Sequence, residues 1–556
     1  MFAGEVLKFK FGHLVSNDTS FGHRFLAPDP FKIVDFKQYK DELKKRFVVL
    51  ETEGRKNLIV EKATKLAESY NVHVRRDDGL LEEVAGLVEW PEALVGSIDP
   101  KFLHLPPEVL VTSIRSHQKY FCANRASGEL APFFIVISNM LTDDKGAAIV
   151  EGNQRVLRAR LSDGIFFWEQ DKKRKLEDRF DDLKRIVFHA KLGTVAEKVV
   201  RIEHLAQFLC VWIPHANLTQ TERAAELCKS DLATGMVGEF PELQGIMGYY
   251  YAKEQGEDEA VALAIRDHYS PLGPDDSVPS QPLSIAVALA DKLDTLTGMF
   301  AAGEKPTGSK DPFALRRAAL GVIRIILENG LSVPLKLAFE NALSRHDTDK
   351  LASSDKEESG GGGLLKKIVS PLTSRVDEHA VTGELLEFFI DRLKALLKGK
   401  GVRHDLISAV FGAGNEDDLL RLTRRVASLD RFLGSDDGAN LLAGYRRAVN
   451  IVSIEEKKDK STYKGVPSKT LLEEEAEKAL FDALHEVKSD IKKALKEEKF
   501  ESAMALLASL RKPIDSFFER VTVNAERPDL RRNRLMLLAQ IRELVDEIAD
   551  FSKIEG

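Results

Sequence analysis

Residues 151–171 read EGNQRVLRARLSDGIFFWEQD, and this stretch indicates the kind of element that dominates the chain. Leu157, Leu161, Ile165 and Trp168 follow one another at intervals of three or four residues, so a helix would place them on one stripe. We expect that stripe to pack in a core. The sequence around it is then best understood as helices joined to a smaller mixed region.

Two arginines, Arg155 and Arg158, lie three residues apart and share a neighbouring face of this predicted helix. Guanidinium groups suit RNA phosphates, and they equally suit salt bridges to carboxylates such as Glu151 and Asp163. The residues alone leave both roles open.

The length of the chain and its charge limit the functions to consider. With 556 residues it is too long for one hydrophobic core, so we expect several domains. The net charge of −7 gives no overall attraction for nucleic acid, so a polyanion would have to meet a local basic patch. Three cysteines without C-x-x-C spacing predict neither a zinc site nor a disulfide framework, which fits a reducing cytosol. No apolar run reaches about eighteen residues, so we expect no membrane span.

The pattern of elements changes near residue 170. Before it, short β-rich runs alternate with turn signals and one helical segment, which predicts an α+β module over residues 1–170. The β-rich runs are FKIVDF (31–36), RFVVLETE (46–53) and FFIVIS (133–138), and the helical segment is KNLIVEKATKLAESY (56–70).

Almost everything after residue 170 predicts helix, so the molecule as a whole is predominantly α. We expect a helical domain over 171–350 and an all-α domain over 421–556. Between them, residues 351–420 read as a Gly-rich linker, SSDKEESGGGG (353–363), followed by a helical connector.

One Gly-rich segment, GEKPTGSK (303–310), nearly matches a phosphate-binding loop. Its last two residues are reversed, because Ser309 precedes Lys310, and the segment follows a predicted helix where a strand is required. We therefore predict a structured loop between two helices. Asp311 and Pro312 suit the start of the second helix, which we expect to begin at Phe313.

Histidines and aspartates in the helical middle are possible metal ligands. Such residues converge from separate helices in metal-dependent phosphohydrolases. No tight spacing signature accompanies them here, so the sequence favours surface and capping roles. No nucleophile elbow of the G-x-S-x-G type occurs either, so no catalytic residue is predicted. The residues considered are His189, His204, His215, His268, Asp231, Asp291 and Asp294.

Arginines gather in the last region, although residues 421–556 are nearly neutral, with 26 Lys and Arg against 25 Asp and Glu. Guanidinium groups bind phosphate oxygens and stack on bases, so a basic face there would suit RNA. Composition alone slightly favours a solvated face paired with neighbouring acids. The clusters are Arg421, Arg424 and Arg425, then Arg446 and Arg447, and then Arg527, Arg531, Arg532 and Arg534.

Several long strings in the chain resemble the β-subunit family of the bacterial two-subunit glycyl-tRNA synthetases. They occur in the same order, and the similarity covers nearly the whole chain. Besides residues 151–171, the strings include SIRSHQKYFCA (113–123), FHAKLGTVAEKVVRIEHLA (188–206), DLATGMVGEFPELQGIMG (231–248), PTGSKDPFALRRAALGVIRI (306–325) and LRKPIDSFFERVTVNAERPDLRRNRLMLL (510–538).

The resemblance implies a subunit of a cytoplasmic enzyme that joins glycine to its tRNA. In this family the adenylate forms in the α subunit, where ATP and Mg²⁺ are expected, so this chain would hold no cofactor and no complete catalytic site. The β subunit supplies most of the surface for tRNA(Gly), and an α₂β₂ tetramer is expected. Residues 1–170 would be similar to the B3/B4 module of phenylalanyl-tRNA synthetase, 171–350 to an HD-type domain, and 421–556 to a DALR-like anticodon-binding domain.

Two departures from the family pattern lead to further expectations. The family's β subunit has another segment ahead of the first residue here, so the front part of the B3/B4-like module is expected to be missing. The HD-like site is expected to be degenerate and without metal. Its matching positions are His189, Asp231 and Asp291, but Ser230 stands where the family of HD phosphohydrolases needs a histidine.

The resemblance also makes the arginines expected RNA contacts. Tyr445 fits base stacking or, more commonly, helix packing, while His117, Arg155 and Arg158 fit tRNA contact and subunit packing equally well. Two alternatives remain: a metal-dependent HD-type phosphohydrolase, which Ser230 argues against, and an assembly scaffold that binds a partner chain without RNA. The expected tRNA contacts are Arg424, Arg425, Arg446, Arg447, Arg531, Arg532 and Arg534, with Arg155 and Arg158.

Overall fold

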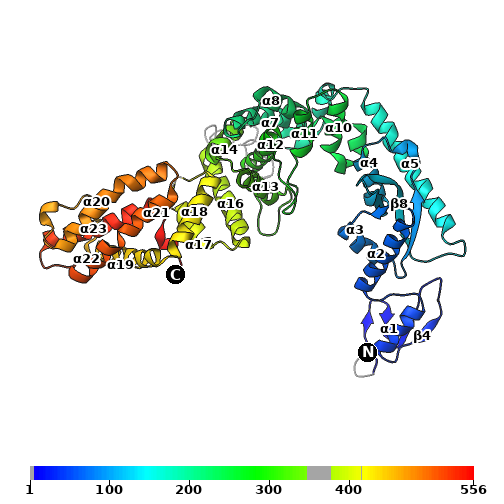
Figure 1. Ribbon diagram of the computed structural model, residues 1–556, viewed down its shortest axis with the longest axis horizontal. Helices are drawn as coiled ribbons and strands as arrows, with labels where there is room; N and C mark the ends of the chain where they lie inside the picture. Colours follow the sequence, from blue (N-terminus) through cyan, green and yellow to red (C-terminus); the bar gives the residue numbers. More distant parts are fainter. Residues whose placement is uncertain (1–4, 347–376, 413, 415, 556) are drawn as a thin grey trace, which may run out of the picture. The chain divides into compact units, whose positions relative to one another are not determined.

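The computed structural model describes residues 5–346, 377–412, 414 and 416–555. Within these residues the chain forms two compact units, each built from two segments (Figure 1). Unit 1 comprises Met1–Leu183 and Lys229–Asp258, and unit 2 comprises Lys184–Cys228 and Glu259–Gly556. The expected linker at 353–363 lies outside the described residues. Helices dominate the described residues, as the sequence predicts, and none of the helices among them is long and apolar enough to cross a membrane.

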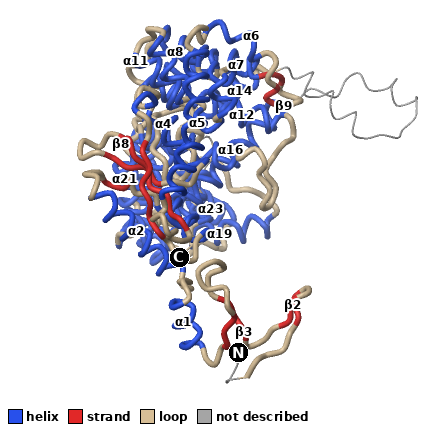
Figure 2. Tube along the Cα trace, turned by 90° about the vertical axis from the view of Figure 1, so that its right-hand side faces the viewer, coloured by secondary structure: helices blue, strands red, loops and turns tan. Residues whose placement is uncertain are grey.

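The centre of unit 1 is a four-stranded antiparallel sheet in the order β5-β7-β8-β6. Figure 2 labels its longest strand, β8. Two helices, α2 and α3, pack their apolar stripes against it, and Ile59, Val84 and Ile135 are buried in the shared core. The predicted α+β character of this region is therefore confirmed. The bounds are β5 His73–Val74, β6 Glu92–Ser97, β7 Phe121–Asn124, β8 Leu130–Ser138, α2 Thr52–Glu68 and α3 Asp78–Leu87.

Two of the three predicted β-rich runs form strands. FFIVIS lies in β8, and FKIVDF contributes to β4 before Asp35 caps the next helix. The prediction for RFVVLETE (46–53) was wrong. Phe47 has a positive φ of 61°, which interrupts an extended chain, and α2 begins at Thr52.

Smaller elements complete the front of unit 1. Strand β3 pairs with β4, and β1 pairs with β2. The bounds are β1 Lys10–Phe11, β2 Leu14–Val15, β3 Thr19–Phe21, β4 Pro30–Lys32, α1 Phe36–Lys45, α4 Pro107–Thr112 and α6 Phe180–Leu183.

Helix α5 (Ala147–Asp171) contains the whole stretch 151–171. Leu157, Leu161 and Trp168 are buried and Ile165 is half-buried, so the predicted core stripe is confirmed. At the end of the helix the Asp171 carboxylate accepts hydrogen bonds from the backbone amides of Gly235 and Met236 and from the hydroxyl of Tyr251.

These contacts tie the segment 229–258 to unit 1, so the compact units divide the chain differently from the four predicted domains, which stay predictions. The segment supplies α9 Gly235–Glu239 and α10 Ile246–Glu254.

Unit 2 is built around α12 (Pro282–Ala301), whose residues are buried along nearly its whole length. Helices α7, α11, α13, α14 and α16 pack against it, as Figure 1 shows. The bounds of these and their neighbours are β9 Val187–His189, β10 Gly193–Thr194, α7 Val195–Leu209, α8 Leu218–Leu227, α11 Glu259–Asp267, α13 Leu315–Glu328, α14 Leu335–Leu343, α16 Glu378–Gly399 and α17 His404–Gly412.

The segment GEKPTGSK is a loop between α12 and α13, as predicted. Helix α13 begins at Leu315, two residues later than expected, because the Asp311 carboxylate accepts hydrogen bonds from the amides of Leu315 and Arg316 at 2.8 and 3.0 Å. Asp311 thus satisfies amides of the first turn of the helix.

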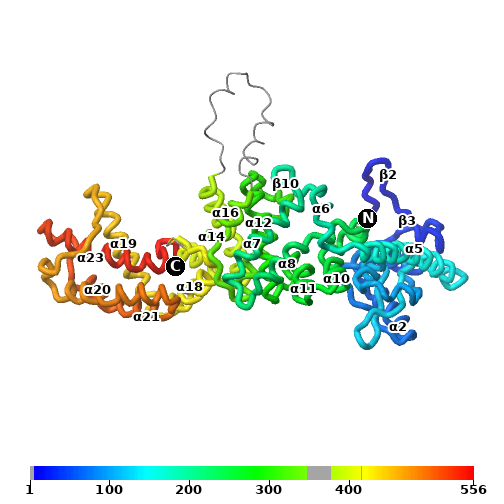
Figure 3. The backbone as a smooth tube through the Cα atoms, turned by 90° about the horizontal axis from the view of Figure 1, so that it is seen from above, coloured from blue at the N-terminus to red at the C-terminus, as the bar shows by residue number. Residues whose placement is uncertain are grey.

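The rest of unit 2 is all helical, in agreement with the prediction for residues 421–556 (Figure 3). Helix α19 packs against α23, and α20 packs against α21 and α22. The bounds are α18 Leu419–Leu433, α19 Asp436–Asp459, α20 Glu475–Lys496, α21 Phe500–Ser509, α22 Arg511–Arg520 and α23 Pro528–Asp546.

Candidate nucleic-acid interface

Two of the predicted arginines present their guanidinium groups on the surface of the C-terminal helices. Arg532 on α23 is exposed and has no hydrogen bond or ion pair to any residue that the structure describes. Arg447 on α19 is also exposed, and its guanidinium carbon lies 4.4 Å from the centroid of the Phe518 ring. Stacking on an aromatic face fixes the plane of a guanidinium group while leaving its N–H edges able to bind phosphate.

Arg424 on α18 is exposed in a more mixed environment. Its guanidinium lies 3.5 Å from the Glu498 carboxylate, and it lines a pocket of about 380 Å³ together with Arg431 and Lys499. Arg431 is itself 2.6 Å from Glu501. Positive and negative groups alternate here, so an anion would have to compete with exposed ion pairs, which are individually weak.

Arg531 and Arg446 are half-buried, and their guanidinium groups interact with other residues of unit 2. Arg531 forms ion pairs with Glu455 and with Asp459, the latter at 2.6 Å, and these carboxylates raise its pKa. Arg446 donates a hydrogen bond of 2.7 Å to the carbonyl of Ile554. Both residues are placed beside the exposed arginines and are engaged mainly with the protein.

Two further predicted contacts, Arg425 and Arg534, are buried. Arg425 donates to the carbonyl of Glu547 at 2.5 Å, and burial lowers its pKa. Arg534 pairs with Glu477 and donates to the carbonyl of Thr522 at 2.8 Å. Each side chain lies on the apolar stripe of its helix, which turns it towards the core. Neither guanidinium is available on the surface as the sequence prediction requires, so we exclude both from the interface.

Tyr445 takes the packing role that its sequence context left as the commoner alternative. Its ring is buried, with a centroid 5.4 Å from that of Phe551, and its hydroxyl donates to Asp546 at 3.0 Å. It is therefore part of the packing of α19 against α23.

In unit 1, the two arginines of α5 behave differently from each other. Arg155 lies 3.2 Å from Glu151, which is one of the two salt bridges that the sequence allows. Arg158 is exposed and lines a pocket of about 350 Å³ together with Asp99 and Gln154. The Nε2 of His117, the third residue left open, lies 3.2 Å from the Glu242 carboxylate.

The four residues of the predicted HD-like site are divided between the two units. Ser230 and Asp231 belong to unit 1, while His189 and Asp291 belong to unit 2. The buried Asp231 carboxylate accepts hydrogen bonds from the amides of Gly245 and Gly248 at 2.5 and 3.0 Å, which anchors the start of α10. Its burial raises the pKa to about 6.

His189 is half-buried on β9. Its Nδ1 accepts a hydrogen bond of 3.3 Å from the amide of Lys191, and its ring meets that of Phe313 edge-on. These contacts are typical of a structural histidine at the end of a strand.

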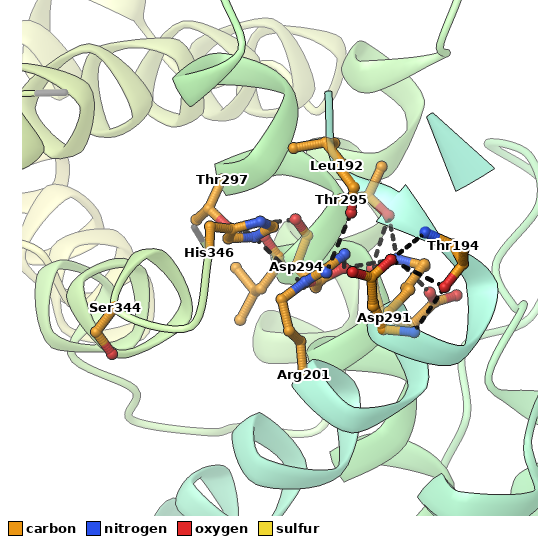
Figure 4. Close-up of polar contacts among 12 residues, drawn as sticks. Leu192, Thr194, Arg201, Asp291, Asp294, Thr295, Thr297, Ser344 and His346 are labelled. Carbon is orange, nitrogen blue, oxygen red and sulfur yellow. Dashed lines mark hydrogen bonds and ion pairs between the residues drawn. The ribbon is translucent and has the colours of Figure 1, made fainter. Parts of the chain in front are cut away.

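Asp291 belongs to a network that we name the buried charge cluster, which consists of Lys198, Arg201, Asp291, Asp294 and His346. Figure 4 labels four of these residues, Arg201, Asp291, Asp294 and His346. The Nζ of Lys198 lies 2.9 Å from Asp291 and 3.0 Å from Asp294. Arg201 donates to Asp294 at 2.6 Å, and the Nε2 of His346 is 3.3 Å from the same carboxylate.

The charges within the buried charge cluster balance one another. Burial alone would raise the pKa of Asp294, but Lys198, His346 and Arg201 hold it well below its usual range. The ammonium group of Lys198 sits between the two carboxylates, where a divalent ion would have to bind. These residues therefore do not fit a metal ion, and no group of three or more His, Cys, Asp or Glu in the described residues has a geometry suited to one.

Asp291 and Asp294 are among the candidates predicted from the sequence, whereas Lys198 and Arg201 are not. Their signal was present: two cations stand at i and i+3 in the apolar helix that includes AEKVVRIEH. A buried cation needs a buried partner, and the pair of aspartates at i and i+3 in LADKLD provides it.

Comparison with known proteins identifies the family to which this chain is similar. Residues 1–412 match the family described as glycyl-tRNA synthetase beta subunit, and residues 443–555 match the DALR anticodon binding domain. The second match covers most of the helices that carry the exposed arginines, α19 to α23.

Curated proteins named glycine–tRNA ligase beta subunit are similar along nearly the entire chain. The protein from Rhodospirillum centenum is 51% identical over 543 residues, which cover 97% of this chain and 72% of that protein. The one from Phenylobacterium zucineum is 47% identical over 560 residues, which cover 100% of this chain and 77% of that protein. The one from Ruegeria sp. is 45% identical over 557 residues, 99% of this chain and 76% of that protein.

Proposed function

The chain belongs to the glycyl-tRNA synthetase beta-subunit family, and on that premise we propose that it binds tRNA(Gly) and positions it for glycylation. It is a subunit of an aminoacyl-tRNA synthetase, with a DALR anticodon-binding domain at its C-terminal end. The observation that carries the proposal is the exposed pair Arg447 and Arg532 on the helices of that domain. Helical anticodon-binding surfaces meet unstacked bases and backbone phosphates, for which guanidinium groups are suited.

The proposed contact residues differ in how directly each would contact the RNA. Arg447 and Arg532 contact phosphates or bases directly, and Arg424 joins them by exchanging its ion pair with Glu498 for RNA. Arg446 and Arg531 lie next to Arg447 and Arg532 in the sequence and are engaged mainly with the protein. In unit 1, Arg158 is the better candidate of the α5 pair because Arg155 already pairs with Glu151. Each phosphate contact releases counterions, so tRNA affinity should fall steeply with salt.

The bond-forming chemistry belongs, in this proposal, to an α subunit that holds ATP and Mg²⁺, within an α₂β₂ assembly in the cytoplasm. The contribution of this chain is to orient the tRNA, which converts a diffuse encounter into a reaction of fixed geometry. The B3/B4-like character of residues 1–170 and the HD-like character of residues 171–350 are part of the same proposal. The buried charge cluster supports the HD-like region as a scaffold, because Lys198 pairs with Asp291, one of the two aspartates matched to the HD-like site.

The test compares a double variant, Arg447→Glu/Arg532→Glu, with the native chain. We expect at least a tenfold weaker affinity for glycine tRNA, because each reversal removes a phosphate contact and adds repulsion. The readouts are tRNA binding by the full chain and, with a cognate α subunit present, the KM for tRNA in glycylation. An Arg345→Glu variant, which changes an exposed arginine outside this face, is the matched control.

Equal tRNA affinity and equal KM in the double variant and the control would contradict the assignment of this face. A native chain that binds an α subunit but retains no tRNA at low salt would favour the scaffold alternative. The phosphohydrolase alternative would require metal-dependent turnover that is lost in Asp291→Asn, which the pairing of Asp291 with Lys198 argues against.

A further inference from the structure

A second basic pocket lies in unit 2, between the first turn of α13 and helix α16. It has a volume of about 500 Å³, and we name it the arginine pocket. Three guanidinium groups face an otherwise apolar lining, and no carboxylate is among the lining residues. The lining consists of Arg316, Arg317, Arg392, Leu272, Gly273, Pro274, Leu320, Ala395 and Leu396.

Arg317 and Arg392 have no carboxylate partner among the described residues. The Nε of Arg392 is buried without a hydrogen-bond acceptor there, and its guanidinium carbon lies 5.3 Å from the Phe388 ring centroid. Arg317 is exposed and donates one long hydrogen bond of 3.5 Å to the carbonyl of Leu272. Without a carboxylate partner in the described part of the chain, these two guanidinium groups are suited to pair with an anionic ligand in the pocket.

The surroundings hold the pocket in a fixed form. Arg316 donates to the carbonyl of Gly308 at 2.7 Å, which fixes its side chain at one wall. Arg324 pairs with Glu328 at 2.7 Å and donates to the carbonyls of Gly273 and Pro274 at 3.1 and 2.9 Å, which holds the opposite loop. Because Asp311 already accepts from the first amides of α13, an anion here would be bound by side chains.

The lining defines the chemistry of a suitable ligand. Guanidinium forks bind the oxygens of a phosphate in pairs, and they stack on the faces of bases. The leucine and proline side chains offer an apolar wall, including Leu272, which is 62% exposed. A free inorganic phosphate would make no apolar contact with that wall, whereas the ribose or base of a nucleotide would. The volume lies within the range of pockets that hold small ligands.

We propose that the arginine pocket binds one nucleotide of the tRNA, with its phosphate on Arg317 and Arg392 and its ribose or base against Leu272 and Leu320. This inference rests on the proposed function and adds a second RNA contact outside the DALR domain. It gives the α-helical region around α12 a direct role in tRNA binding. The pocket would then help to align a tRNA that the C-terminal helices hold elsewhere.

The test uses the full chain with Arg317→Ala/Arg392→Ala, and Arg345→Ala as the matched control. Binding of glycine tRNA is measured by fluorescence anisotropy over a series of salt concentrations. We expect about tenfold weaker binding and a salt slope smaller by about 1, because one phosphate contact is lost. The control should equal the native chain. A second variant, Arg317→Lys/Arg392→Lys, keeps the charge and should recover part of the affinity.

Parallel arms use AMP and inorganic phosphate as probes, and association with an α subunit as a further readout. The inference is overturned if the double variant binds tRNA as tightly as the control does. It is also overturned if the double variant loses binding of AMP, phosphate or the α subunit while its tRNA affinity is unchanged. If that result coincides with the expected loss in Arg447→Glu/Arg532→Glu, the proposed function stands without this pocket. If the native chain binds no tRNA, both fail. Should the alanine variant lose its helical circular dichroism, the lysine variant decides by its affinity alone.

Discussion

The buried charge cluster and the exposed arginines of the C-terminal helices both contain cationic side chains, but these side chains have different roles in the two regions. Arg201 and Lys198 are buried and locked onto Asp294, whereas Arg532 reaches the surface with no ion pair to any residue that the structure describes. The first arrangement holds helices together, and the second leaves a charge able to meet an outside phosphate. Burial and the nearest carboxylate decide the role, while residue type alone does not.

Helix α23 repeats this contrast within one turn. Arg532 is exposed, and Arg534, two residues later, is buried against Glu477. A helix rotates by about 100° per residue, so positions two apart face widely separated directions. Arg532 and Arg534 therefore cannot both contribute to one site on this helix, although they lie close together in the sequence.

The largest effect should come from breaking the buried charge cluster. Asp294→Asn would leave Lys198 and Arg201 buried with too little negative charge, which we expect to lower the free energy of unfolding by about 5 kcal/mol. Urea unfolding, with hydrogen exchange of α7 and α12 to locate the transition, measures the change. Asp391→Asn, at a side chain that is 65% exposed, is the control. Equal stability of the two variants would mean that the cluster does not hold the helices together.

Glu477→Gln tests the buried half of the contrast on α23. The amide keeps a hydrogen-bond acceptor for Arg534 and removes the charge, so we expect a loss of about 3 kcal/mol in unfolding free energy. The same urea experiment on Arg532→Gln provides the comparison at the exposed position. Equal stability of the two variants would contradict the structural role that we assign to the pair of Arg534 with Glu477.

A carboxylate for which the effect of burial outweighs its stabilising partners should respond to pH in the opposite sense to Asp294. Burial raises the pKa of Asp231 to about 6 in the folded chain, above its ordinary value of 3.8. The folded state therefore binds this proton more tightly, and the stability it contributes is full below pH 3.8 and is lost as pH rises through about 6. The change is about 2–3 kcal/mol, since one pKa unit corresponds to about 1.4 kcal/mol.

The measurement compares native chain and Asp231→Asn by urea unfolding between pH 4 and pH 7.5. The stability of the variant relative to the native chain should rise across this window and level off above pH 6, because the variant has no proton to lose. A difference that stays flat with pH would show that Asp231 does not titrate as its burial implies.

The smallest effect on stability is expected at the exposed arginine. Arg532→Ala should change the free energy of unfolding by less than about 0.5 kcal/mol, because it removes no buried contact. The same variant should reduce the salt slope of tRNA binding by about 1. Anisotropy titrations in two salt concentrations and one thermal melt suffice. A large loss of stability with an unchanged slope would reverse the role we assign to it.

Much of the fold could be predicted from periodicity. The stripe of Leu157, Leu161 and Trp168, the buried α12 and the loop at 303–310 are local properties, which spacing and capping rules describe. The run RFVVLETE failed because a positive φ at Phe47 is not visible in β-propensity. Local sequence also does not state which of two close arginines turns inward.

The site was harder to predict for a physical reason. Lys198 and Asp294 are almost a hundred positions apart in the chain, so only the packing of α7 against α12 brings them together. The arginine pocket likewise joins α13, α16 and a loop, none of which is basic enough to be singled out alone. The family resemblance identified the role of the chain, and the contacts of each side chain had to come from the structure.

The position of Lys198 also has a consequence when metal ions are scarce. An ion held in a protein can be lost to a chelator or to a starved medium, whereas an ammonium group at the end of a side chain cannot diffuse away. The helical region around α12 should therefore keep its form whatever the supply of zinc, manganese or iron.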